Sequence, residues 1–208
     1  MARLKSSWNF RDKQRSMKDI GSALSFNIWQ ISGNGVLELE NEGFQTDTKS
    51  QRLDVLCEYA AYLLQLADRM TYDILTEEQR NQLISAAGLH LASIIQDNRY
   101  DTEYEKAEGK DYIQEFLSLL NSRINDYSGC KFSSIDGPSF VFLRLLGDHV
   151  TLKMGEKDKK WITSYVIDIS GDKLFKAFRR ILPGLLDPAK KLNEKSESEL
   201  DLGKNYDV

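Results

Sequence analysis

Cysteine and histidine are scarce in this chain, which has two of each among 208 residues. Cys57 and Cys130 are too few for a disulfide framework in a chain of this size. No run reaches the roughly 18 uncharged apolar residues needed to span a bilayer, and no apolar signal-peptide core follows the basic start. We therefore expect a cytoplasmic protein, in which Cys57 is a small buried hydrophobe.

The chain also lacks a strong excess of either charge. Its 28 Lys and Arg residues face 32 Asp and Glu residues, which gives a net charge of −4. Binding of nucleic acid needs a basic surface, so the overall charge weighs against such a partner, although a local basic patch stays open. The hydrophobic share of 41% is ordinary for a globular protein, and the length suits one domain with tails.

Motifs that carry common enzyme chemistry are missing as well. There is no Gly-x-Ser-x-Gly nucleophile elbow. A di-iron bundle needs Glu-x-x-His pairs, but the residue three before His90 is Ala87 and the residue three before His149 is Leu146. Cys130 follows an expected helix end, where a thiolate is disfavoured. We therefore assign no catalytic residue, no metal ligand and no cofactor.

The strongest pattern present is an apolar seam with spacings of three and four residues. A second apolar row lies beside it, so the apolar face is wider than a two-stranded coiled coil needs. This width predicts that the helix, over about 51–75, is a central member of a bundle. The seam comprises Leu53, Leu56, Ala60, Leu63, Ala67, Met70 and Ile74, and the second row comprises Val55, Tyr59, Tyr62 and Leu66.

Thr76 and Gln79 then match a capping box that opens a second helix. With the seam, this helix predicts an αα-hairpin over about 51–97. A third helix is expected over about 111–127, and a short one from Pro138 through Leu146. The expected apolar face of the second helix is Leu83, Ile84, Ala87, Leu91 and Ile94.

Two segments suggest small antiparallel β-hairpins. At 25–40, the triplet Gly33-Asn34-Gly35 separates two short runs and is typical of a tight turn. At 149–169, apolar residues alternate with polar ones on both sides of a turn-like charged stretch. Helix remains the alternative for both 25–40 and 161–169. The predicted fold is thus mainly α, a helical bundle built on the 51–97 hairpin with one or two small β-hairpins.

The ends are expected to be less ordered than the middle. Residues 1–19 form a polar, flexible lead-in, and 20–186 form one globular domain. A final helix over 173–182 is expected to end at Pro183-Gly184. The charged tail 187–208 has few apolar residues, which predicts disorder.

Two groups of side chains are candidate sites. The first could line a ligand pocket between helices, although tyrosines packed at the bundle edge with wet hydroxyls, and a hydrogen-bonded histidine at the core edge, are the favoured interpretation. The second forms an amphipathic basic helix, which can bind a partner or an anionic membrane. That helix is short, and its basic residues also favour its dipole, so a packed surface helix is preferred. The groups are Tyr59, Tyr62, Asp68 and His90, and Lys173, Lys176, Arg179 and Arg180.

These patterns favour a non-enzymatic protein-interaction or regulatory module, acting through a helical face or by homodimerisation. One alternative is a small-molecule or metal-binding protein, or an enzyme, with a pocket between helices. Another is peripheral contact with a membrane or nucleic acid through the basic helix 173–182, against which its shortness weighs.

Overall fold

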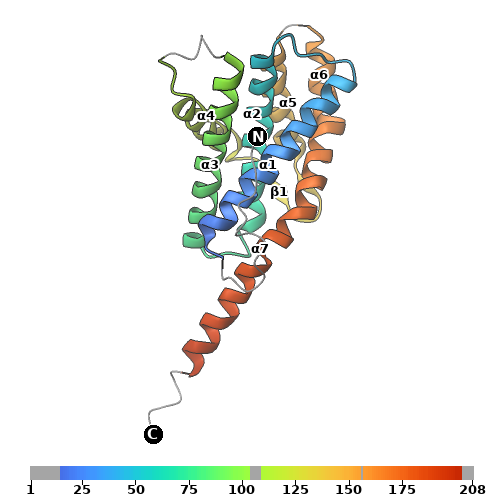
Figure 1. The fold of residues 1–208 in the computed structure, drawn as a ribbon. Helices are drawn as coiled ribbons and strands as arrows, with labels where there is room; N and C mark the ends of the chain where they lie inside the picture. Colours follow the sequence, from blue (N-terminus) through green and yellow to red (C-terminus); the bar gives the residue numbers. More distant parts are fainter. Residues whose placement is uncertain (1–14, 104–108, 156, 203–208) are drawn as a thin grey trace.

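The middle of α2 (Lys49–Thr71) is the centre of the structure, because every residue from 55 to 67 is buried. The computed structural model describes residues 15–103, 109–155 and 157–202, with side chains through residue 186. In this part of the chain, α2 contacts α1, α3, α4, α5 and α7 (Figure 1). The prediction that this helix is a central bundle member is therefore confirmed.

The chain is mainly helical, as predicted, and the starts of its helices follow from side-chain caps. Thr76 Oγ1 accepts from the Gln79 backbone N–H at 3.3 Å, and Gln79 Oε1 accepts from the Thr76 N–H at 3.1 Å, so the predicted capping box is present. The elements are α1 (Met17–Asn41), α2, α3 (Glu77–Glu103), α4 (Tyr112–Tyr127), β1 (Phe132–Ser133), β2 (Gly137–Pro138), α5 (Phe140–Met154), α6 (Lys159–Tyr165), the π-helical segment η3 (Val166–Ser170) and α7 (Gly171–Leu202).

Residues 25–40 form a helix, so the hairpin predicted there is wrong. They belong to α1, whose buried positions recur every three or four residues. Gly33-Asn34-Gly35 lies inside this helix, and a Cβ at Gly35 would lie 2.9 Å from Leu174 Cδ2 and 3.2 Å from the Tyr59 ring. Packing of the helical stripe on the core outweighs the local preference of Gly and Asn for a turn. The buried apolar members are Met17, Ile20, Ala23, Leu24, Ile28, Val36 and Leu39.

The hairpin predicted at 149–169 is also wrong, because this segment is helical throughout most of its length. In α5 the buried Phe142, Leu146, Val150 and Met154 are spaced by four residues, whereas Leu152, which the alternating pattern placed on the same face, is 75% exposed. Val150 and Met154 fit both the two-residue period of a strand and the period of a helix. The helix forms because it buries the longer stripe, whose residues are spaced by four positions. Residues 161–169 belong to α6 and η3, which is the helical alternative.

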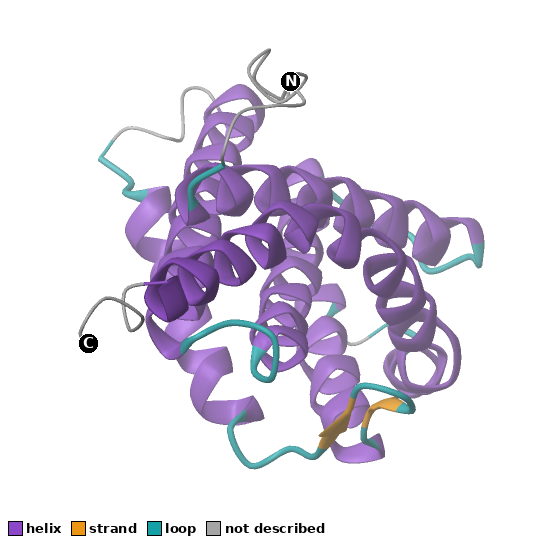
Figure 2. Ribbon diagram, turned by 90° about the horizontal axis from the view of Figure 1, so that it is seen from below, coloured by secondary structure: helices purple, strands orange, loops and turns teal. Residues whose placement is uncertain are grey.

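The observed two-stranded antiparallel sheet lies elsewhere, with Phe132 opposite Pro138 and Ser133 opposite Gly137. Gly137 has a φ of +88°, and a Cβ there would lie 2.6 Å from the Phe175 ring of α7, so the sheet depends on glycine at this point. The helix predicted to begin at Pro138 begins two residues later. Pro138 belongs to β2, and α5 begins at Phe140 after the Ser139 cap. Figure 2 places the two strands at the edge of the bundle.

Helix α7 does not end at Pro183-Gly184 as predicted. Leu185 and Leu186 beyond the proline are buried, and their packing offsets the hydrogen bond that proline cannot donate. The ribbon of α7 continues past the other helices (Figure 1). Residues 1–14 and the side chains of 187–208 lie outside the described part, so the flexible lead-in and the disordered tail stay predictions, although α1 already begins at Met17.

Candidate functional site

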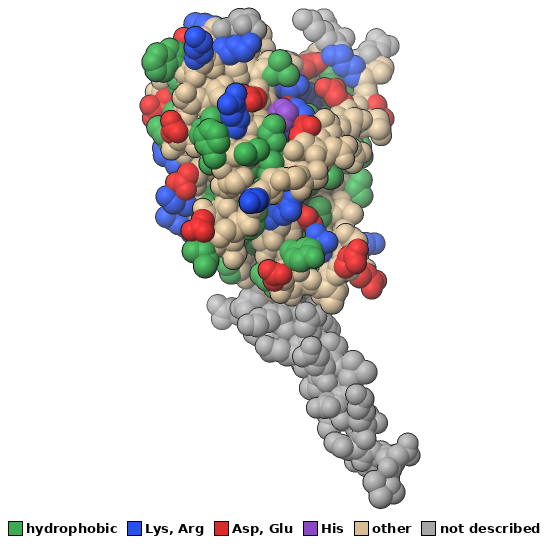
Figure 3. All heavy atoms as spheres, turned by 180° about the vertical axis from the view of Figure 1, so that it is seen from behind, with side chains coloured by type: hydrophobic (Ala, Val, Ile, Leu, Met, Phe, Trp, Pro, Cys, Tyr) green, Lys and Arg blue, Asp and Glu red, His purple; other side chains and the backbone are tan. Residues whose placement is uncertain are grey.

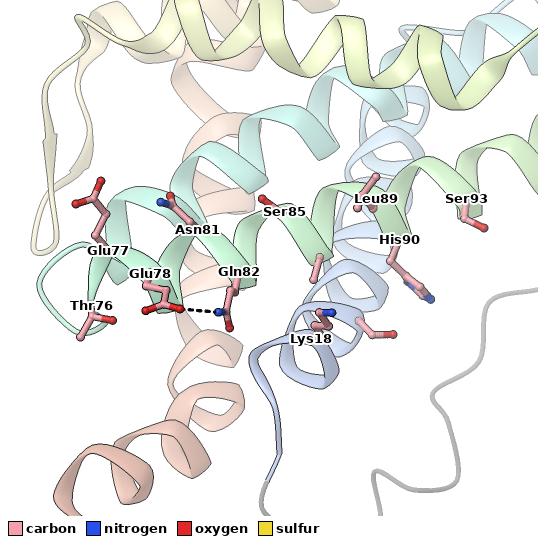
Figure 4. A pocket seen from close by; sticks show the side chains of 12 residues that line it. Lys18, Thr76, Glu77, Glu78, Asn81, Gln82, Ser85, Leu89, His90 and Ser93 are labelled. Carbon is pink, nitrogen blue, oxygen red and sulfur yellow. Dashed lines mark hydrogen bonds between the residues drawn. The ribbon is translucent and has the colours of Figure 1, made fainter. Parts of the chain in front are cut away.

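A long groove lies between the start of α1 and the first two thirds of α3. Its volume is about 1300 Å³, and its lining runs along α3 from Thr76 to Ser93. At 1.5 Å per residue this stretch is about 25 Å long. Figure 4 shows Gln82, Ser85, Leu89 and Ser93 along one side of α3. The groove is therefore long enough to hold several turns of a helix.

Short side chains line much of this groove, which would allow another backbone to come close. Ser22, Ser85, Ala86 and Ser93 are all among its lining residues. Leu89 lies among them and is 59% exposed, although it is a large apolar side chain. Beneath the groove α1 and α3 touch tightly, since a Cβ at Gly21 would lie 2.8 Å from Ala86 Cβ. The floor is thus fixed by direct helix packing.

The two ends of the groove differ in charge. Glu77 and Glu78 are exposed at the start of α3, where carboxylates also favour the helix dipole. Glu78 accepts a hydrogen bond from Gln82 Nε2 at 3.3 Å (Figure 4). Near the other end, His90 Nδ1 lies 2.6 Å from Ser25 Oγ of α1, which agrees with the hydrogen-bonded histidine expected at the core edge. One end of the groove therefore carries two carboxylates and the other carries His90, and Lys18 of α1 also lines the groove.

The four residues of the predicted ligand pocket are not brought together. Tyr59 and Tyr62 are fully buried: Tyr59 Oη accepts from Ser170 Oγ at 3.1 Å, and Tyr62 Oη donates to the Gly171 carbonyl at 3.2 Å. Burial raises the pKa of both phenols. Asp68 instead pairs with Arg80 Nη1 at 2.6 Å. The favoured edge packing with wet hydroxyls is wrong as well, since Tyr59 joins α2 to η3 and Tyr62 joins α2 to the start of α7.

The predicted basic residues lie on the surface of α7 and differ in their partners. Lys173 pairs with Glu38 of α1 at 3.1 Å, and Lys176 pairs with Asp172 at 2.6 Å. Arg179 Nη1 donates to the carbonyl of Ile135 at 3.0 Å, which joins α7 to the turn between β1 and β2. Arg180 is exposed, and neither it nor Arg179 forms an ion pair in the described part of the chain.

Arg179 borders a group of exposed apolar side chains that the sequence patterns did not single out. Ile135 at the sheet turn is 77% exposed, and the first two residues of α5, Phe140 and Val141, are 63% and 59% exposed. The exposed Lys131 is joined to the residue before α5, because its carbonyl accepts from the Ser139 N–H at 3.0 Å. We call this set the hairpin surface; its members are Lys131, Ile135, Phe140, Val141, Arg179 and Arg180.

No family model, curated protein or solved structure matches this chain. The geometry of the described residues is therefore the basis for any functional proposal. Figure 3 shows that basic and acidic side chains are mixed over the face opposite to that of Figure 1, with hydrophobic side chains in small separate groups. This mixture fits the small net charge of the chain, which has no large surface of one charge on this face.

A second, smaller hollow lies among α2, α3, α4 and the end of α5, with a volume of about 220 Å³. On one wall Arg99 is nearly buried and pairs with Asp54 and with Glu103. Lys153 and Glu115 also line it, and neither has an ion-pair partner within the described residues. The remaining lining is Cys57, Ile95, Tyr112, Phe116 and Leu119.

Chemistry beyond binding finds little support in these sites. Burial raises the pKa of the Cys57 thiol to about 12, even though Arg99 lies beside it, so it is a protonated, poorly nucleophilic group. Within residues 15–103, 109–155 and 157–186, no three His, Cys, Asp or Glu side chains are grouped to hold a metal ion. In the same ranges no helix is long and apolar enough to cross a bilayer.

The exposed apolar residues that sequence reasoning missed share one signal. Leu89 falls outside the stripe of Leu83, Ala87 and Leu91 on α3, just as Val141 falls outside the buried stripe of α5. Once the buried stripe of a helix is known, the large apolar residues outside that stripe are expected to be exposed. In α5 a helix was predicted only through Leu146 and a strand from 149 onward, so the full buried stripe from Phe142 to Met154 could not be recognised.

Proposed function

We propose that this protein is a non-enzymatic interaction module that binds an α-helical segment of a partner protein in the groove between α1 and α3. The observation that carries the proposal is the combination of a groove about 25 Å long with short side chains along it and the exposed Leu89 among them. Helices that bind in grooves place apolar anchors on such surfaces, three or four residues apart.

The charges of the groove define the partner further. Glu77 and Glu78 favour basic side chains over the start of α3, although Lys18 of α1 also lines the groove, and Leu89 favours an apolar anchor toward the other end. The partner is thus an amphipathic helix with an apolar stripe and lysine or arginine residues toward one end. Charge complementarity of this kind contributes to specificity and to the rate of association.

Selection from a displayed library of helical peptides tests this proposal. Peptides selected on the full chain are counter-selected against Ser85→Arg, which places a long charged side chain in the groove. We expect basic amphipathic helices whose affinity, measured by fluorescence anisotropy, falls at least about tenfold in Ser85→Arg and in Leu89→Asp. Leu152→Asp is the matched control, because Leu152 is an exposed leucine outside the groove.

Two results would contradict the partner helix. Selected peptides that bind all three variants equally well would place the interaction elsewhere. A wild-type dimer in light scattering that becomes a monomer in Ser85→Arg would make a second copy of this chain the occupant, so that homodimerisation would replace the partner helix.

A second candidate, small-molecule binding, is favoured by the 220 Å³ hollow rather than by the tyrosines predicted for it. Lys153 and Glu115 offer one positive and one negative group without ion-pair partners, and Ile95, Phe116 and Leu119 add apolar surface. These groups suit a small zwitterion such as an apolar amino acid. A ligand that binds only the folded state raises the melting temperature, so a thermal-shift screen of amino acids, repeated with Lys153→Ala, tests this candidate.

A further inference from the structure

We propose that the hairpin surface binds the surface of an anionic lipid bilayer. This site is separate from the groove and does not depend on the function proposed for it. Its apolar part is formed by Ile135, Phe140 and Val141, and each of these side chains is more than half exposed. Three large apolar side chains are thus exposed within seven residues of the chain. Exposed apolar side chains that gather on a surface mark interaction sites.

The position of these side chains is held firmly by the fold. Phe132 of β1 packs edge-on against Phe175 of α7, with ring centroids 6.0 Å apart, and Gly137 lies directly over the same ring. Arg179 holds the turn through the carbonyl of Ile135. Ile135 is therefore presented on a turn that is anchored to α7 at several points.

Three cations of this surface have no ion-pair partner in the described part of the chain, and one of them, Arg179, contacts the turn directly. Lys131, Arg179 and Arg180 have no acidic partner among the described residues, unlike Lys173 and Lys176 farther up the same helix. One carboxylate, Asp136, lies at the turn and accepts from Ser133 Oγ at 3.1 Å. The surface thus keeps an excess of positive charge in a chain whose net charge is −4.

The shape of the surface favours a bilayer over a peptide. Its apolar residues lie on a turn and at the start of a helix, and neither hollow described above includes them. Figure 2 shows the two strands that flank the turn at the edge of the bundle. A peptide needs a groove for its side chains, whereas the headgroup region of a bilayer accepts a projecting apolar tip with basic residues around it. In the sequence, the shortness of the basic helix weighed against binding to a membrane. The exposed apolar residues of the hairpin surface add the apolar contact area that this short helix lacks.

Co-sedimentation of the full chain with lipid vesicles tests the proposal. We expect binding to vesicles of phosphatidylglycerol and phosphatidylcholine, at least about tenfold weaker binding to pure phosphatidylcholine, and weaker binding at high salt. Each basic residue near an anionic surface contributes about fivefold to affinity, so Arg179→Glu/Arg180→Glu is expected to lose at least about tenfold. Equal sedimentation with both kinds of vesicle, or none with either, would overturn the proposal.

Matched variants separate the apolar contribution from charge alone. Ile135→Asp/Phe140→Asp is expected to lose at least about tenfold, whereas Leu152→Asp, an exposed leucine outside the surface, keeps wild-type binding. Lys49→Glu at the start of α2 controls for net charge. A double aspartate variant that binds like Leu152→Asp would contradict the apolar tip.

A probe at position 135 reports whether the tip enters the bilayer. Cys57 and Cys130 are both buried, so an environment-sensitive dye can be directed to Ile135→Cys. We expect its emission to shift to shorter wavelength with anionic vesicles and to stay unchanged with a single-stranded oligonucleotide. A shift with the oligonucleotide but not with vesicles would make the surface a nucleic-acid site and overturn the proposal.

Discussion

Glu58 of α2 and Arg123 of α4 form a two-pronged ion pair inside the bundle. Arg123 Nε donates to Glu58 Oε2 at 2.6 Å, and Nη2 donates to Oε1 at 2.7 Å. The Glu58 side chain is fully buried, so its charge is balanced by Arg123 rather than by water. Arg123 Nη1 also donates to Asp126, whose carboxylate lies 3.2 Å from His149 Nε2. Hydrogen bonds thus link α2 to α4, and His149 of α5 lies next to this group.

Removing one partner of this pair is expected to cost more than removing both. Arg123→Met leaves the Glu58 carboxylate buried without a partner and is expected to lower the free energy of unfolding by about 3–5 kcal/mol. Glu58→Leu/Arg123→Met replaces the pair with apolar groups and is expected to recover most of this loss. Urea unfolding followed by circular dichroism measures both. A double variant less stable than Arg123→Met would contradict the expectation.

The neighbouring His149 is expected to make stability depend on pH. Burial, followed by the charge of Arg123, lowers the pKa of His149 below its ordinary 6.5, in spite of Asp126. The unfolded chain therefore binds a proton first as the pH falls below about 6.5, and the free energy of unfolding decreases. We expect a smaller decrease in His149→Gln, measured by urea unfolding between about pH 7.5 and pH 5. An unchanged slope would contradict this assignment.

Glu103 predicts a separate loss of stability at more acid pH. Burial by itself would raise the pKa of Glu103, but hydrogen bonds from Tyr112 Oη, Lys110 Nζ and Ser50 Oγ outweigh it and lower the pKa to about 2 from 4.5. The ionised carboxylate is thus favoured in the folded state, and its contribution is complete above about pH 4.5 and disappears toward pH 2. Glu103→Gln is expected to be less stable at neutral pH and to lose less on acidification.

The αα-hairpin could be predicted from sequence because its signals are local and agree with each other. The seam through Met70 and the second row specify one helix at the same positions, and the Thr76 cap specifies the start of the next. The partner of Glu58 could not be predicted, since Arg123 lies 65 residues away and only the packing of α4 on α2 brings it there. The hairpin surface was missed for the same reason, because Ile135 and Arg179 meet through tertiary structure.

The two cysteines are expected to be protected in the native protein. Burial raises the pKa of both thiols, that of Cys57 to about 12, so very little thiolate is present near neutral pH. Reaction with a coloured disulfide reagent at about pH 8 is expected to be slow in buffer and to reach two thiols per chain in urea. Rapid reaction of one thiol in buffer would show that its part of the core opens readily.

Gly33 and Gly35 provide the sharpest test of why 25–40 is a helix. A Cβ at Gly33 has no heavy atom within 4 Å, so Gly33→Ala removes only the entropic cost of glycine and is expected to stabilise the protein by about 0.5–1 kcal/mol. At Gly35 the same atom meets Leu174 and the Tyr59 ring, and overpacking costs about 1–3 kcal/mol. Gly35→Ala is therefore expected to destabilise the protein, as measured by urea unfolding. In a hairpin turn both glycines would instead be needed for backbone freedom, and both substitutions would destabilise.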